Sequence, residues 1–228
     1  MSLPVLYAHP FSSYCQKVLI ALYETDAPFT YRVLDGTPAV QEELARLWPL
    51  QRFPVLVDQG RTVVESSIII DYLTQHHPGP AAPLIPADAD AALEVRMLDR
   101  FFDNYVMTPM QTIVHNQLRP ETTRDPFGVA AARKMLEAAY QWIDGRLGME
   151  GKRTTDRTTW VAGGDFSLAD CAAAPSLFYA DWVQEIDARF GHLRAYRARL
   201  LAHPAVARCV EEARPYRSYF PLPVPDRD

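Results

Sequence analysis

A run of prolines in the first half of the chain constrains its fold more than any other feature. Residues 78–87 contain four prolines. Proline lacks a backbone N–H and fixes its own φ angle, so neither a helix nor a strand continues through such a run. We therefore expect two domains, residues 1–80 and residues 88–228, joined by a linker over residues 81–87.

The N-terminal domain alternates between strand and helix patterns. Apolar runs at residues 4–8 and 29–34 predict two strands, and each is followed by residues with helical spacing. Residues 54–57 and 62–64 flank a polar turn, which predicts a hairpin, and a further helix starts near Glu65. A helical crossover implies parallel strands, whereas a hairpin implies antiparallel ones. The expected architecture is an α/β domain with a mixed four-stranded sheet and helices on its faces.

The pattern after the linker is helical throughout, so we expect an all-α C-terminal domain. One long helix is expected over residues 88–117, with a kink at Pro109, because proline removes a hydrogen bond from the helix. The remaining expected segments are helices over residues 126–147, from 167 onward, and over 192–201 and 204–214, an exposed loop over 148–165 and an irregular tail over 221–228.

Composition and charge exclude several classes of function. The net charge of −5 and the scattered basic residues argue against a nucleic-acid partner. No stretch approaches the roughly 18 apolar residues of a membrane span, and we expect no secretory leader. The three cysteines, Cys15, Cys171 and Cys209, are widely spaced. They favour a reducing compartment, hence the cytoplasm, and together with the scattered histidines they show no metal-ligand spacing.

Four residues between the first expected strand and the first helix form one candidate site: Ser12, Ser13, Tyr14 and Cys15. A helix N-terminus favours an anion, and a serine hydroxyl there can donate a hydrogen bond to a thiolate. The alternative is that Ser12 or Ser13 only caps the helix. We interpret Cys15 as a small buried hydrophobe, because no second cysteine stands at position 12 to form a redox pair.

A second candidate site combines Phe53-Pro54 with Glu65-Ser66. Proline fits the first position of a strand, and by itself the sequence favours a trans peptide bond there. A glutamate and a serine at the start of a helix can hold the ammonium and carboxylate groups of an amino acid. The alternative is that Glu65 complements the helix dipole and Ser66 caps the helix.

Together these segments resemble the cytosolic glutathione transferase family over nearly the whole chain. Residues 12–15 stand where the thioredoxin fold begins its first helix with Cys-x-x-Cys, and residues 48–54 resemble the family's Asn-Pro-x-Gly-Lys-Val-Pro segment, whose proline is cis. Residues 164–170 match the capping segment of the helical domain. In that segment Ser167 caps the helix, Asp170 reaches back to the cap residue, and Phe166 can form a hydrophobic staple. The resemblance implies a thioredoxin-like N-terminal domain.

The resemblance also implies roles for individual residues, with glutathione as co-substrate and no metal. Ser12 would activate the glutathione thiol, as serine does in theta-like and zeta-like classes, and Ser13 is the fallback. The remaining implied glutathione contacts are Phe53 before a cis Pro54 for the cysteinyl part, Glu65 and Ser66 for the γ-glutamyl group, and Arg52 for the glycyl carboxylate.

Departures from the family pattern are Trp48, Gln51 and Phe53, where the family has Asn, Gly and Val. Tyr7 lies in the first strand, where other classes place a catalytic tyrosine, and we interpret it as a core or wall residue.

In this family the electrophile binds between the first loop and the helical domain. That likeness suggests Phe11, Tyr105 and Met110 as substrate-binding residues, with Met107 and His115 as weaker candidates. The alternative for such a stripe at helical spacing is core packing. Tyr216 and Tyr219 can either fold back over the site or anchor the tail.

The leading hypothesis is a cytoplasmic, homodimeric glutathione transferase of detoxification that joins the glutathione thiolate to a small, largely apolar electrophile. One alternative is a non-catalytic protein of the same fold that binds glutathione or other ligands. Another is a glutathione-dependent isomerase, and a third is a glutathione-dependent disulfide or peroxide reductase that uses Cys15.

Overall fold

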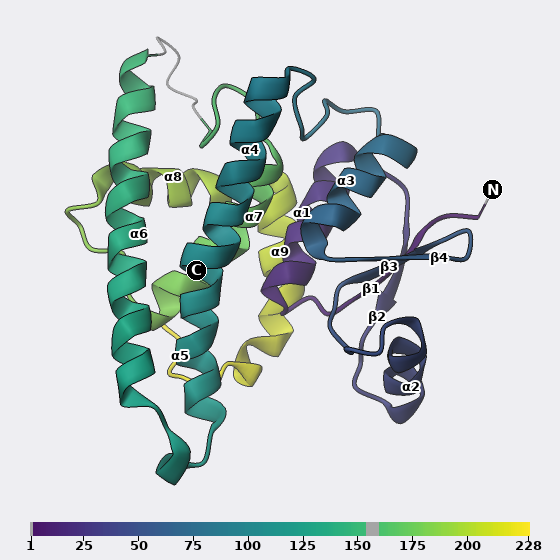
Figure 1. The fold of residues 1–228 in the computed structure, drawn as a ribbon, viewed down its shortest axis with the longest axis horizontal. Coiled ribbons are helices and arrows are strands. Elements are labelled where there is room, and N and C mark those ends of the chain that lie inside the picture. The colour runs from purple at the N-terminus through teal and green to yellow at the C-terminus, as the bar shows by residue number, and fades with distance from the viewer. Residues whose placement is uncertain (1, 154–159) are drawn as a thin grey trace.

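The computed structural model describes residues 2–153 and 160–228. A small sheet with its helices occupies one end of the molecule, and long helices form the other (Figure 1). The four strands are β1 (Val5–Ala8), β2 (Thr30–Val33), β3 (Val55–Asp58) and β4 (Arg61–Val64). They are arranged in the order β2-β1-β3-β4, with β1 parallel to β2 and antiparallel to β3, and β3 antiparallel to β4. The predicted mixed sheet and thioredoxin-like order are confirmed.

Three helices accompany the sheet, namely α1 (Ser13–Thr25), α2 (Pro38–Leu47) and α3 (Ser66–His76). Helix α2 covers a small core that includes Tyr7 and Val55. Helix α1 packs against α3 on one side and against α7 (Leu168–Val183) and α9 (Pro204–Ala213) on another. Gln16 and Lys17, which stand beside the apolar stripe of α1, are therefore buried as well. Because α1 is buried on two faces, polar groups lie in the middle of the molecule, where each needs a hydrogen-bond or ion-pair partner.

The long helix expected over residues 88–117 has an irregular middle. It consists of α4 (Ala89–Phe101), a π-helical segment η1 (Phe102–Met107) and α5 (Thr108–Leu118). The N–H of Thr108 donates to the carbonyl of Asp103, five residues back. Pro109 has no N–H for the ordinary bond and its ring crowds the preceding turn, so the widened turn lies just before the proline.

Helix α6 (Pro126–Arg153) is longer than expected. The expectation of a loop from residue 148 onward is wrong for residues 148–153, because the helix continues along α8 (Gly191–Ala202). Gly148 lets His192 approach so closely that a Cβ atom would lie 2.9 Å from the imidazole. Residues 154–159 of the expected loop lie outside the described residues. The short elements η2 (Glu121–Thr123) and η3 (Arg214–Tyr219) complete the fold.

Helix α7 is buried along its whole length and forms the centre of the helical part. The predicted capping segment precedes it: the Asp170 carboxylate accepts from the Ser167 N–H at 2.9 Å and from the Tyr196 hydroxyl at 2.6 Å. In the described part of the chain, no helix has the length and apolar character that a membrane span requires.

Candidate functional site

Two cavities meet at the loop between β1 and α1. The first, here called the polar cavity, encloses about 590 Å³, and the second, the aromatic cavity, about 660 Å³. Ser12, Phe53, Gln111 and His115 line both of them. The loop connects β1 to α1. The start of α3 lines the polar cavity, and α5 forms a wall common to both cavities.

Ser12 stands at the junction of the two cavities. It is the N-cap residue of α1, but its side chain makes no hydrogen bond to the helix backbone. The capping alternative therefore does not account for this hydroxyl, which lies beside the positive end of the α1 dipole. Ser13 is the first residue of the helix, is buried, and lines the aromatic cavity only. Of the two serines, Ser12 is the one in contact with both cavities.

Cys15 is fully buried, one turn into α1. Burial raises the pKa of its thiol to about 12, against the opposing hydrogen bonds from the Ser12 side chain and the His9 N–H. A thiol in this setting stays protonated at neutral pH and is a poor nucleophile. This agrees with the interpretation of Cys15 as a buried hydrophobe.

The start of α3 brings Glu65 and Ser66 to the polar cavity. Glu65 is the N-cap residue, so Ser66 is not the cap, and the Glu65 side chain accepts no hydrogen bond from the helix backbone. The φ angle of Glu65 is 69°, in a region that residues with a side chain rarely occupy. Such backbone strain concentrates at binding and catalytic sites.

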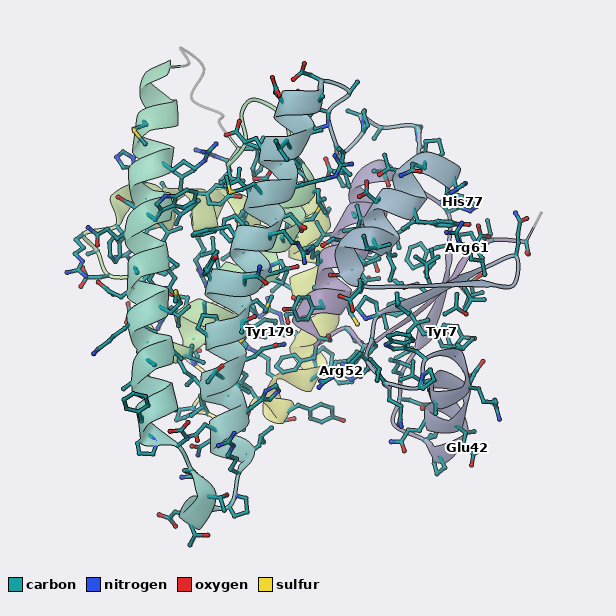
Figure 2. The ribbon with its side chains drawn as sticks, in the orientation of Figure 1. Tyr7, Glu42, Arg52, Arg61, His77 and Tyr179 are labelled. Carbon is teal, nitrogen blue, oxygen red and sulfur yellow. The ribbon has the colours of Figure 1, made fainter. Side chains whose placement is uncertain are left out.

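The segment before β3 supplies the opposite wall of the polar cavity. Arg52, Phe53 and Pro54 line it, and the Phe53–Pro54 bond is cis, as the family resemblance implies. Gln51, where the family has glycine, takes a φ angle of 52°. Arg52 is exposed and lies between α2 and the helical part of the molecule (Figure 2). Its guanidinium is therefore accessible to a carboxylate in the cavity.

A buried ion cluster lies behind the polar cavity. The Lys17 ammonium contacts Asp99 at 2.5 Å and Asp103 at 2.8 Å, and it donates to the Ser67 hydroxyl at 2.9 Å. Arg100 contacts Ser67, Asp99 and Asp103 at the cavity edge. Burial raises the pKa of Asp103, and Lys17 opposes that shift. The cluster ties α1 and α3 to α4 and η1, and so fixes the start of α3.

The sequence prediction did not include this cluster. Its signal was a lysine beside the apolar stripe of α1, together with two aspartates four positions apart on the long helix expected after the linker.

Phenylalanine, tyrosine and methionine side chains line the aromatic cavity together with aliphatic and polar residues. Phe11 and Met110, the two candidate substrate-binding residues, line it, and the Phe11 and Tyr179 rings meet edge to face with centroids 5.4 Å apart. The Tyr179 hydroxyl donates to the Phe11 carbonyl at 2.9 Å and so fixes the loop to α7. Tyr216 and Tyr219 fold back over this cavity. His9, Gln111 and Tyr179 also line it, and sequence reasoning did not find them.

Two candidate substrate-binding residues, and Tyr7, lie outside both cavities. Tyr105 lines neither cavity, is 47% exposed, and packs against the Phe101 ring. Met107 belongs to the core. Tyr7 donates from its hydroxyl to Glu43 at 2.8 Å and lies in the core under α2, as expected for a core residue. Among residues 2–153 and 160–228, no group of three or more His, Cys, Asp or Glu side chains is arranged to hold a metal ion.

Comparison with known proteins identifies the family. The family models for the glutathione S-transferase N-terminal domain and C-terminal domain match residues 6–81 and 126–199. A probable maleylacetoacetate isomerase of Vibrio cholerae is 30% identical over 220 residues, covering 92% of this chain and 97% of the relative. A glutathione S-transferase of Pseudomonas putida is 28% identical over 165 residues, covering 72% and 69%.

Comparison with solved structures points to the same family. The structure of a Methylobacterium radiotolerans glutathione S-transferase in complex with glutathione sulfonate has a TM-score of 0.75 and 28% identity, covering 91% of this chain and 94% of that one. The chain therefore belongs to the glutathione S-transferase family.

Proposed function

We propose that this protein is a glutathione transferase, which binds glutathione in the polar cavity and joins its sulfur to a small, largely apolar electrophile in the aromatic cavity. The observation that carries the proposal is the position of Ser12. Its hydroxyl does not cap helix α1 and lies at the helix N-terminus where the two cavities meet, so a sulfur atom beside it faces both cavities. We also propose two domains, residues 1–80 and 88–228, with the site between them.

The free energy needed to stabilise the glutathione thiolate beside Ser12 is within what the site can supply. A free cysteine thiol has a pKa of about 8.5, so only a few per cent is ionised at neutral pH. Lowering that pKa by roughly two units requires about 2.7 kcal/mol of preferential stabilisation of the thiolate. A charge-assisted hydrogen bond from Ser12 and the dipole of α1 together are of this size.

The polar cavity offers a partner for each end of glutathione. Glu65 and Ser66 suit the ammonium and carboxylate of the γ-glutamyl group, and exposed Arg52 suits the glycyl carboxylate. The backbone of Phe53 is the proposed partner of the cysteinyl part. The complex of the Methylobacterium radiotolerans relative with glutathione sulfonate supports glutathione as the co-substrate here.

Glutathione-dependent isomerisation is the second candidate function, because the Vibrio cholerae relative is described as a probable maleylacetoacetate isomerase. It would use the same thiolate at Ser12. A reductase that uses Cys15 has less support, since that thiol is fully buried and its pKa is raised.

We further propose a cytoplasmic homodimer. Exposed apolar side chains gather where α4, η1 and α6 meet. The centroid of the half-buried Phe101 ring lies 4.4 Å from that of exposed Trp142 and 5.6 Å from that of exposed Tyr105, and Met97 on α4 is exposed as well. An apolar patch of this kind suits a second copy of the chain. Sedimentation velocity tests this directly, and a monomer at micromolar concentration would contradict it.

The decisive experiment measures glutathione binding and turnover in the same preparations. Calorimetry should detect binding of glutathione to the wild-type protein, and 1-chloro-2,4-dinitrobenzene should be converted. Ser12→Ala should lower kcat/KM by about 10- to 100-fold, the value of one charge-assisted hydrogen bond. Cys15→Ala should retain activity. Activity that survives Ser12→Ala and disappears with Cys15→Ala would overturn the assignment.

A further inference from the structure

His9 is the one imidazole of the β1–α1 loop, and its orientation is set by the backbone. The N–H of Phe11 donates to its Nδ1 at 3.1 Å. A ring nitrogen that accepts a hydrogen bond carries no proton, so the proton of the neutral imidazole is on Nε2. His9 therefore presents a fixed N–H donor two residues before the loop's Phe11 and three before Ser12.

Within residues 2–153 and 160–228, no group accepts a hydrogen bond from the Nε2 donor. Among the described residues, the Phe11 contact is the single hydrogen bond of the His9 ring, and Nε2 is not a buried atom. His9 lines the aromatic cavity together with Ser12. The cavity that we assign to the electrophile is thus lined by a residue that carries an accessible N–H donor.

Two tyrosines of η3 hold the His9 ring in place. The Tyr216 ring meets it edge to face at 4.7 Å, and the Tyr219 ring stacks on it at 6.0 Å. Burial also lowers the pKa of His9, which keeps the imidazole neutral at neutral pH. A neutral imidazole in fixed orientation can polarise an oxygen acceptor without transferring its proton.

We propose that His9 is a second catalytic residue, whose Nε2–H donates to an oxygen of the electrophile that is conjugated to the carbon under attack. The inference rests on the proposed transferase function. The substrate class is then an uncharged aryl or unsaturated compound that carries a nitro or carbonyl oxygen.

The reaction with an activated aryl chloride illustrates the role. The glutathione thiolate forms a C–S bond at the carbon that bears chlorine, and the displaced electron pair of the ring moves onto a nitro oxygen. The His9 N–H stabilises that developing charge and keeps its proton. The electron pair then returns, the C–Cl bond breaks, and chloride leaves with its electrons.

The charges around the aromatic cavity favour an electrophile without a carboxylate. No lysine or arginine of the described chain lines it, whereas Arg52 and Arg100 line the polar cavity. Asp35 lines the aromatic cavity, and hydrogen bonds from Thr37 lower the pKa of its carboxyl. An anionic electrophile would meet a carboxylate and no permanent cation.

The test compares two electrophiles in wild type, His9→Phe and His9→Gln. The first is 1-chloro-2,4-dinitrobenzene, which has conjugated oxygens, and the second is benzyl chloride, which has none. His9→Phe keeps an aromatic ring against Tyr216 and Tyr219 but removes the donor. It should lower kcat/KM by about 10- to 100-fold for the nitro compound and by less than about twofold for benzyl chloride. His9→Gln, which restores an N–H donor, should recover part of the loss.

A matched pair tests the charge of the substrate. Wild type should convert 1-chloro-2,4-dinitrobenzene with a rate enhancement at least about tenfold above that for 4-chloro-3,5-dinitrobenzoate, each relative to its uncatalysed reaction. If His9→Phe lowered kcat/KM equally for 1-chloro-2,4-dinitrobenzene and for benzyl chloride, the inference about His9 would be overturned while the proposed function would stand. His9 would then only support η3. Failure of wild type to convert any of these electrophiles would overturn the proposed function as well.

Discussion

The polar and aromatic cavities share a wall and are built by different means. The polar cavity rests on the buried cluster of Lys17, Asp99 and Asp103, which holds the start of α3 against the helical part. The aromatic cavity rests on ring packing among the first loop, α7 and η3. Fixed charges suit one constant, charged ligand, whereas rings and methionine adapt to varied apolar ones. Each cavity should therefore respond to its own set of substitutions.

The largest expected effect lies in the ion cluster. Lys17→Met removes the buried cation of Asp99 and Asp103 and leaves them only the half-exposed Arg100, so it should lower the free energy of unfolding by about 3–5 kcal/mol in urea denaturation. The control is Arg96→Met, which removes an exposed pair with Asp71 and should cost about 0–1 kcal/mol. If the two variants lowered the free energy of unfolding by similar amounts, the buried cluster would stabilise the fold no more than an exposed ion pair does.

Substitution at the start of α3 should separate the two cavities. The double variant Glu65→Gln/Ser66→Ala should raise the Kd of glutathione by about 10- to 100-fold, because it loses hydrogen bonds to charged groups. The electrophile's KM at saturating glutathione should change by less than about twofold. The control Glu42→Gln lies on α2, away from Arg52 and Tyr179 (Figure 2), and should bind glutathione normally. An unchanged Kd in the double variant would refute the γ-glutamyl assignment.

The converse experiment acts on the aromatic cavity, with the aryl chloride 1-chloro-2,4-dinitrobenzene as electrophile. Met110→Ala removes an apolar wall and should raise the KM for this electrophile by about 3- to 10-fold, with the Kd of glutathione unchanged. Tyr105→Ala is the matched control, because Tyr105 lines neither cavity. A rise in KM with Tyr105→Ala as large as with Met110→Ala would show that the electrophile binds elsewhere.

The smallest effect is expected at the edge of the polar cavity. Arg52 is exposed, so its contact with the glycyl carboxylate is screened by solvent. Arg52→Ala should raise the Kd of glutathione by about 2- to 5-fold in calorimetry. Binding of the glycyl ethyl ester of glutathione, which lacks that charge, should be equal in the two proteins. An equal loss for acid and ester would place Arg52 away from the glycyl end.

Local patterns in the sequence predicted much of the fold and part of the candidate site. The strand and hairpin patterns predicted the mixed sheet, and the segment around Ser167 and Asp170 predicted the start of α7. Local signatures predicted that Ser12 and the Glu65-Ser66 pair stand at helix starts, whereas their roles toward glutathione came from the family resemblance and stay predictions. Helix α6 was predicted too short. Its Gly148 packs against His192 of α8, which is far away in the sequence, so a local pattern could not show that the helix continues through this glycine.

The sequence by itself determined the order of the elements and the residues at the helix starts, since each depends on a few neighbouring residues. Tertiary structure alone decided which side chains meet. It brought Lys17 to Asp99 and Asp103, turned Tyr216 and Tyr219 onto His9, and left Tyr105 outside both cavities. These contacts join residues far apart in the chain, and their free energy depends on burial, which no local pattern encodes.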